Sequence, residues 1–109
     1  MNEIKLFESK QVRTLWDSLE EKWYFVVSDV ISILTDTPDA ADYIKKMRKR
    51  DGILSDAWSQ IVIPKQFETA GGKQSLNCAE AKGLLRIIQS IPSAKAEPFK
   101  QWLAQVWYE

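Results

Sequence analysis

The sequence predicts an α+β fold with a small antiparallel sheet, a helix-turn-helix-like pair and two C-terminal helices. Apolar and polar residues alternate through residues 4–27, which is the period of a half-buried strand. The period changes at Ser28, and in several later segments the apolar residues recur at three- and four-residue spacing, which is the period of a helix face. At 109 residues, with 45% hydrophobic residues, the chain suits one domain with a core of its own. We therefore expect residues 1–109 to form a single domain.

The first three strands are expected to form an antiparallel meander. They span residues 4–8, 11–16 and 23–27, and short polar turns separate them. Trp16 and Trp23 flank the second turn, so their rings are placed to pair across the two strands.

Two short helices joined by a tight turn are expected next. Ser28 can cap the first helix through its hydroxyl. Thr37 can cap the second helix, which spans residues 38–50, and Pro38 suits its first position because a missing N–H costs nothing there. Asp51-Gly52 ends it. The pair resembles a helix-turn-helix.

The middle of the chain predicts a second hairpin. Residues 60–63 read as a short strand that Pro64 breaks, and residues 56–60 are ambiguous. Gly71-Gly72 is the strongest hairpin turn in the chain, with residues 73–77 as the returning strand.

Two helices are expected to complete the fold. Residues 79–91 have a wide apolar face, and Pro92-Ser93 breaks the pattern. The last helix carries Phe99, Trp102 and Val106 on one face, and the sequence leaves open whether it starts at residue 93 or just before Pro98.

Missing residue types argue against an enzyme. The chain has no histidine, which excludes a histidine base, a serine–histidine triad and any metal site with histidine ligands. Gly71-Gly72 is an isolated pair and not a phosphate-binding loop. We therefore expect no catalysis, no cofactor and no metal.

The chain carries no apolar run of the ~18 residues that would span a bilayer and no visible signal peptide. A single cysteine, Cys78, cannot form an internal disulfide, so a cytoplasmic protein with no membrane partner is expected. Residues 107–109 continue the helical pattern without a cap, which indicates the N-terminal domain of a longer protein.

The most informative feature is a run of cations. Between Tyr43 and Arg50 the chain carries five positive charges and no negative charge, although its net charge is +0. A neutral protein that gathers its cations on one short element presents a local positive surface, for which nucleic acid is the usual partner. On a helical wheel Ala40, Ile44 and Met47 form a thin apolar seam that anchors the helix. The candidate DNA-binding residues on this helix are Tyr43, Lys45, Lys46, Lys49 and Arg50.

A solvated helix face is the alternative interpretation of these cations. Asp39, Asp42 and Asp51 flank the run and could neutralise it. Like charges at i,i+4 spacing, such as Lys45 and Lys49, repel by about 0.2–0.5 kcal/mol per pair. A surface that retains this repulsion is more readily explained by a binding function. The residues alone leave the two interpretations evenly balanced.

The glycine hairpin offers a further candidate. Lys65 and Lys73 lie beside its tip, from which Lys73 could reach a phosphate backbone. An ordinary mobile loop is the simpler interpretation of this hairpin when it is considered alone.

Two segments resemble a known family. Val12-Arg13-Thr14-Leu15-Trp16, followed by residues 23–30, is similar to the opening of the Bro-N family, the N-terminal domain of viral Bro proteins and prophage antirepressors. Residues 79–104 resemble that family's helix–serine–helix signature, most specifically between Leu84 and Trp102. This half is most similar to a bacterial branch that includes DNA-damage-inducible protein D.

The resemblance implies a DNA-binding α+β domain, commonly followed by a separate C-terminal domain, in prophage antirepressors, other phage regulators or damage-response proteins. Thr37-Pro38-Asp39 fills the turn that the family places between two helices. Residues 51–66 follow the family least, so no contact role carries onto Lys65. The expected partner is double-stranded DNA, and the alternative is a protein-binding module that acts on a repressor. A homodimer is compatible with so short a helix.

Overall fold

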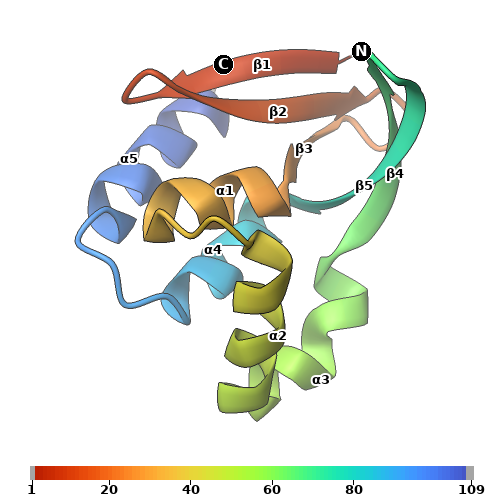
Figure 1. The fold of residues 1–109 in the computed structure, drawn as a ribbon. Helices are drawn as coiled ribbons and strands as arrows, with labels where there is room; N and C mark the ends of the chain where they lie inside the picture. Colours follow the sequence, from red (N-terminus) through yellow and green to blue (C-terminus); the bar gives the residue numbers. More distant parts are fainter. Residues whose placement is uncertain (1, 108–109) are drawn as a thin grey trace.

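A computed structural model describes residues 2–107 of the chain, with side chains described for residues 3–106. The last described helix ends at Trp107. The expectation of a longer protein depends on residues 107–109, whose side chains lie outside the described part of the chain. The predicted α+β class is confirmed, because a five-stranded sheet packs against helices that lie on one side of β1 and β2 (Figure 1).

All the strands of the described chain form one antiparallel sheet in the order β1-β2-β3-β5-β4. Their bounds are β1 Asn2–Phe7, β2 Lys10–Asp17, β3 Lys22–Val26, β4 Ile63–Thr69 and β5 Gly72–Glu80. The predicted meander is confirmed as β1 to β3, and Trp16 lies opposite Trp23 with their ring centroids 5.3 Å apart. Strand β5 pairs with β3 and so joins the second hairpin to the meander, a pairing that the sequence analysis did not address.

The helices are α1 Val27–Thr35, α2 Ala40–Arg50, α3 Gly52–Ile61, α4 Ala81–Gln89 and α5 Ala96–Trp107. The predicted pair of short helices is confirmed as α1 and α2, which pack against each other. The start of the last helix, left open by the sequence, is Ala96, whose N–H donates to the carbonyl of Ser93.

The predicted caps of the first two helices are wrong. Val27, expected to end a strand, begins α1, and no side chain caps this helix, so Ser28 lies within it. Helix α2 begins at Ala40, and its cap is Asp39, whose carboxylate accepts from the N–H of Asp42. The hydroxyl of Thr37 instead accepts from the N–H of Asp39 and shapes the preceding turn.

The segment after α2 is helical, which the sequence did not predict. Asp51 ends α2 and also caps α3, where its carboxylate accepts from the N–H of Leu54. The predicted strand over residues 60–63 is wrong, because α3 continues to Ile61 and β4 runs through Pro64. Strand β4 lies at the edge of the sheet and pairs with β5 alone. An edge strand tolerates proline, because one side of the strand has no neighbour that needs its N–H groups.

The glycine hairpin is confirmed with a shift of one residue. Thr69 lies opposite Gly72, so the two turn residues are Ala70 and Gly71. Gly72 has a φ of 102°, a conformation that side chains with a Cβ rarely adopt.

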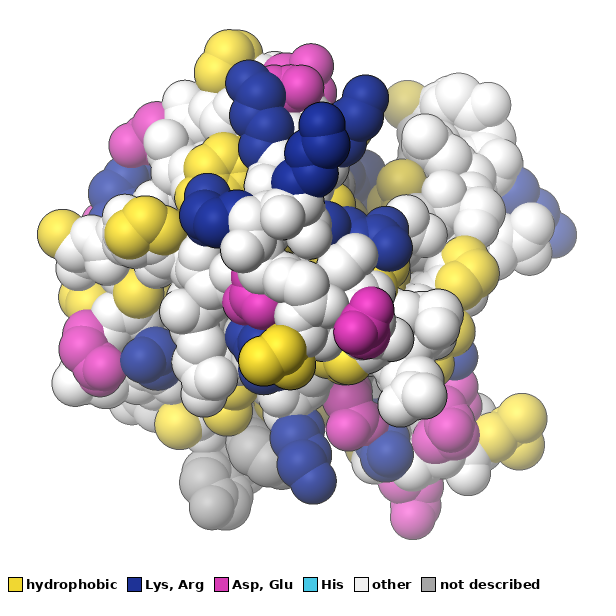
Figure 2. Space-filling model, turned by 90° about the horizontal axis from the view of Figure 1, so that it is seen from below, with side chains coloured by type: hydrophobic (Ala, Val, Ile, Leu, Met, Phe, Trp, Pro, Cys, Tyr) yellow, Lys and Arg dark blue, Asp and Glu magenta, His cyan; other side chains and the backbone are white. Residues whose placement is uncertain are grey.

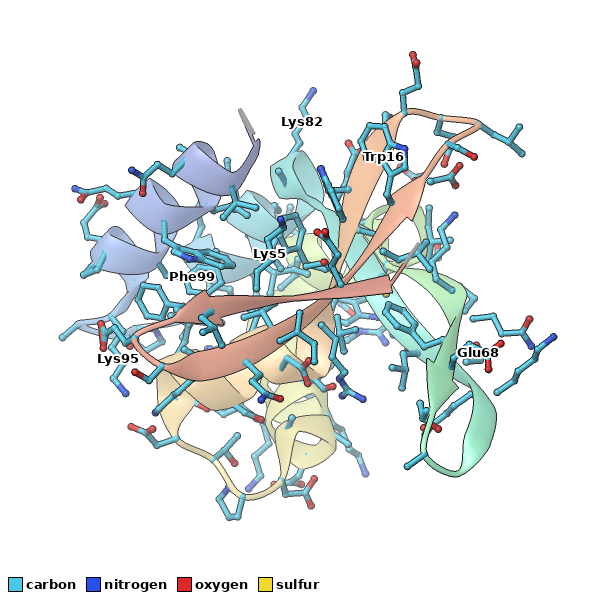
Figure 3. All side chains as sticks on the ribbon, turned by 90° about the horizontal axis from the view of Figure 1, so that it is seen from above. Lys5, Trp16, Glu68, Lys82, Lys95 and Phe99 are labelled. Carbon is cyan, nitrogen blue, oxygen red and sulfur yellow. The ribbon has the colours of Figure 1, made fainter. Side chains whose placement is uncertain are left out.

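The main core lies between the sheet and the helices. Its largest fully buried side chains include Phe25, Ile31, Leu84 and Phe99. Phe99 on α5 lies against the β1–β2 hairpin (Figure 3), and its ring centroid is 5.0 Å from those of Phe7 and of Trp102. The indole N–H of Trp102 also donates to the carbonyl of Leu6 at 2.7 Å. This aromatic cluster therefore fixes the edge strand β1 to α5.

A smaller core lies on the opposite face of the sheet. It consists of Tyr24, Val26, Phe67 and Cys78, which come from β3, β4 and β5. Burial raises the pKa of the Cys78 thiol to about 12. The thiol is therefore a packing group and is protonated at neutral pH.

Gly83 allows α4 to approach the end of α3. A Cβ at this position would lie 2.8 Å from Cγ2 of Ile61, which is fixed because it branches at the Cβ of a helical residue. We expect Gly83→Ala to lower the free energy of unfolding by about 1–2 kcal/mol, the overpacking cost reduced by the better helix propensity of alanine.

The control is the same substitution in an Ile61→Ala background, where Cγ2 is absent. There Gly83→Ala should stabilise the protein by up to about 1 kcal/mol, because only helix propensity remains. Urea unfolding of the four proteins measures both effects. Equal effects of Gly83→Ala in the two backgrounds would show that Ile61 is not the obstacle.

Candidate nucleic-acid interface

Helix α2 is held to the domain by the apolar seam that the sequence predicted. Met47 is fully buried, and Ala40 and Ile44 are partly buried against the core. Tyr43, which was expected to point outward, also packs against the core and is half-buried. The ring is therefore less available to a partner than its selection as a candidate contact residue assumed.

The lysines of α2 point away from this seam. Lys45 and Lys49 are exposed, and neither forms an ion pair or hydrogen bond with a residue that the structure describes. Lys46 pairs with Asp42 one turn earlier, with Nζ 3.0 Å from the carboxylate, but its side chain stays 74% exposed. Such an exposed pair contributes little and is readily exchanged for a phosphate.

The molecule seen from the end where α2 and α3 lie shows Lys and Arg side chains gathered at one edge (Figure 2). Of the acids that flank the run, Asp42 pairs with Lys46 and Asp51 pairs with Arg86. Among the described residues, no acid pairs with Lys45 or Lys49. The predicted positive surface is therefore present, with Lys45 and Lys49 as its unpaired members.

Arg50 differs from the lysines because it is also used within the fold. Its Nη2 donates to the carbonyl of Ser90 at 2.7 Å, just after α4. Arg86 on α4 contacts the carboxylate of Asp51 at 3.2 Å. The N–H of Leu54, followed by Ser90 and Arg86, lowers the pKa of Asp51. These contacts fasten the α2–α3 junction to α4, so Arg50 keeps only its remaining N–H groups for a partner.

Sequence reasoning did not select Arg48, which the structure places beside α3. Its Nε donates to the hydroxyl of Ser55 at 3.3 Å, and its guanidinium lies over the ring of Trp58, 5.1 Å from the centroid. The signal in the sequence was the position of Arg48 at the margin of the apolar seam. Its partners could not be identified because the segment that carries them was not recognised as a helix.

A cleft of about 380 Å³ separates α2 and α3 from strand β5. It is lined by Val27, Ser28, Ala41, Ile44, Arg48, Trp58, Ser75, Leu76 and Asn77. Residues alternate between the faces of a strand, so Lys73 lies on the same face of β5 as Ser75 and Asn77. The exposed Lys73 therefore continues the β5 wall of the cleft toward the hairpin tip, where it lies opposite Glu68 (Figure 3).

Lys65 on β4 lies on the opposite face of the sheet from Lys73, and its ammonium group forms contacts within the domain. Its Nζ lies 2.9 Å from the carboxylate of Asp17 and 4.3 Å from the ring centroid of Tyr24. Lys65, together with the N–H groups of Glu20 and Leu19, lowers the pKa of Asp17 to about 2. The absence of a contact role for Lys65 agrees with its place in this pair.

Two further clefts lie where β3 and β5 meet α4. The larger, about 560 Å³, has Lys22, Glu80 and Arg86 on its walls, and the other, about 460 Å³, has the Trp16–Trp23 pair. Nζ of Lys22 lies 2.9 Å from the carboxylate of Glu80, so their charges are matched within the domain. Burial raises the pKa of Tyr24, whose hydroxyl donates to Glu20.

In the part of the chain that the structure describes, no three or more acidic or cysteine side chains converge to hold a metal ion. Within the same residues, none of the helices combines the length and apolar character needed to cross a membrane.

Comparison with known proteins supplies the family. No curated protein and no solved structure matches the chain. A family model described as the BRO family, N-terminal domain, matches residues 11–108. The match covers nearly the whole chain, including α2, the glycine hairpin and both C-terminal helices. The chain therefore belongs to the BRO family and contains that family's N-terminal domain.

Proposed function

We propose that this chain is the non-enzymatic DNA-binding domain of a prophage antirepressor-type or damage-inducible regulator. BRO N-terminal domains are generally associated with DNA-binding, antirepressor-like proteins. The observation that carries the proposal is the pair of exposed, unpaired ammonium groups of Lys45 and Lys49 on a helix anchored by Met47. Cations held outward on a fixed helix contact phosphates with little rearrangement of the fold.

In the proposed complex α2 lies against duplex DNA. Lys45, Lys46 and Lys49 contact phosphates, and Lys73 reaches the backbone from the hairpin. Arg50 contacts a phosphate or a base edge through the N–H groups that Ser90 leaves free, and Tyr43 contacts a base edge. The affinity is mostly electrostatic, since few of these groups can read sequence.

Binding to a 20-base-pair duplex at several salt concentrations tests this proposal. If Lys45, Lys46, Lys49 and Lys73 each neutralise one phosphate, with or without Arg50 as a fifth contact, the logarithm of the affinity should fall with the logarithm of salt concentration with a slope of roughly −4 to −5. Fluorescence anisotropy of labelled duplex measures the slope, and the stoichiometry from the same titration reports whether two copies bind together. A domain that does not bind the duplex even at low salt would contradict the proposal.

A protein partner, such as a repressor, is the second candidate. Ile53, at the start of α3 and close in sequence to Arg50, is 77% exposed. An exposed apolar side chain beside arginine is more typical of a protein interface than of a phosphate-binding surface. Capture of a repressor that persists at high salt, together with no affinity for DNA, would favour this function.

A further inference from the structure

The cleft between α2, α3 and β5 has the form of a binding site and lies beside the proposed DNA-binding lysines. Ala41, Ile44 and Arg48 line it at helical spacing along one face of α2. Lys45 follows Ile44 on the adjacent row of the same helix, and its ammonium group is exposed. The volume of about 380 Å³ lies within the usual range for small-molecule sites.

Arg48 is fixed in this cleft before any ligand binds. Its guanidinium lies over the indole ring of Trp58, and Ser55 accepts from Nε. Arg48 forms no ion pair with a carboxylate that the structure describes, so its charge and its remaining N–H donors are available. The guanidinium is a planar group, and planar groups of this kind stack on flat rings.

The opposite wall carries exposed or half-buried polar side chains. Ser75 and Asn77 project from β5, and Ser28 lies at the start of α1. None of these three side chains forms a hydrogen bond with the residues that the structure describes. Ser75 and Asn77 precede the buried Ala79 on the same face of β5 and are exposed, because this part of the sheet extends beyond the main core. The cleft thus combines a stacking plane with hydrogen-bonding groups opposite it.

We propose that this cleft binds a single nucleotide, whose base stacks on Arg48 and whose base edge meets Asn77 and Ser75. Lys45, on the adjacent row of α2, holds the phosphate. A planar base fits the flat guanidinium, and an amide pairs with the donors and acceptors of a base edge. A base within an intact duplex cannot enter a concave site, so the nucleotide is either free or unpaired within a DNA strand. In the second case the inference rests on the proposed function.

The experiment compares two DNA molecules that differ by one nucleotide. Affinity is measured for a 20-base-pair duplex and for the same duplex with one additional, unpaired nucleotide. The wild-type domain should prefer the second DNA by about tenfold, which is the usual effect of stacking one base on a protein side chain. In parallel, each of the four deoxynucleoside 5′-monophosphates is titrated into labelled domain, and the amide NMR shifts of residues 75–77 are followed.

The test variant is Ser75→Ala/Asn77→Ala, and the matched control is Gln74→Ala, an exposed amide on the other face of β5. The double variant should lose the preference and keep the affinity for the intact duplex, and the control should keep both. Arg48→Lys, which retains the charge and loses the planar group, should also lose the preference. Thermal unfolding of each variant shows that the fold is retained.

The outcomes separate the cleft from the DNA-binding helix. Shifts at residues 75–77 with a monophosphate, but no preference between the two DNAs, identify a free nucleotide as the ligand. A preference without shifts identifies an unpaired nucleotide in DNA. Equal affinity for the two DNAs together with no shifts overturns the inference and leaves the proposed function standing, whereas no affinity for either DNA overturns the proposed function.

Discussion

Replacing Lys45 and Lys49 together by glutamate should lower the affinity for duplex DNA by roughly 100-fold at about 0.15 M salt. Both ammonium groups are exposed and unpaired, so the change removes two phosphate contacts and adds two repulsive charges. The slope of affinity against salt should also become shallower by about 2. Anisotropy titrations at several salt concentrations measure both effects.

The neutral variant Lys45→Gln/Lys49→Gln shows whether the loss of affinity comes from the missing charges or from a less stable helix. A glutamate near the C-terminus of α2 opposes the helix dipole, whereas glutamine does not. We expect the neutral variant to lose about 10-fold in affinity and the same two units of slope.

The matched charge control is Lys82→Glu/Lys100→Glu, which changes the net charge equally. Lys82 projects from α4 on the side of the molecule away from α2 (Figure 3), and Lys100 lies on α5, paired with Glu97. This variant should bind DNA within about twofold of wild type, because charges farther from the contact surface than the screening length have little effect. Equal losses in the two charge-reversal variants would show that net charge, and not α2, governs binding.

Phe99→Ala should lower the free energy of unfolding by about 3–5 kcal/mol, the range found for buried phenylalanine. Phe99 is fully buried and its ring contacts Phe7 and Trp102, which hold β1 to α5. The truncation leaves a cavity between these two elements and removes their aromatic contacts. Since small domains are marginally stable, a loss of this size should unfold much of the protein at 37 °C.

Phe99→Leu is the conservative comparison, because it retains most of the apolar volume and removes the ring contacts. Its cost should be about 1–2 kcal/mol, and the difference between the two variants measures the cavity. Urea unfolding followed by circular dichroism gives both values. A loss below 1 kcal/mol in Phe99→Ala would show that the α5–β1 contact does not stabilise the domain.

Local patterns predicted most of the elements correctly. Alternation identified β1 to β3, with Trp16 opposite Trp23, and the adjacent glycines located the β4–β5 turn to within one residue. The prediction for residues 60–63 was wrong because Val62 and Ile63 follow α3 directly. This β-branched run concealed the helical spacing of Leu54, Trp58 and Ile61. Pro64 was also read as the end of a strand, although β4 continues through it. An edge strand can contain a proline, and only the order of the strands in the sheet shows that β4 is at an edge.

The sequence by itself determined that α2 is a cationic helix with an apolar seam, because both properties depend on the 3.6-residue period of one short segment. Only the tertiary structure decided which cations remain free. Arg50 is bound to Ser90 and Lys65 to Asp17, whereas Lys45 and Lys49 have no such contact among the described residues. The bound cations meet partners that lie 40 and 48 residues away in the chain, and contacts over that separation exist only once the sheet and helices have packed.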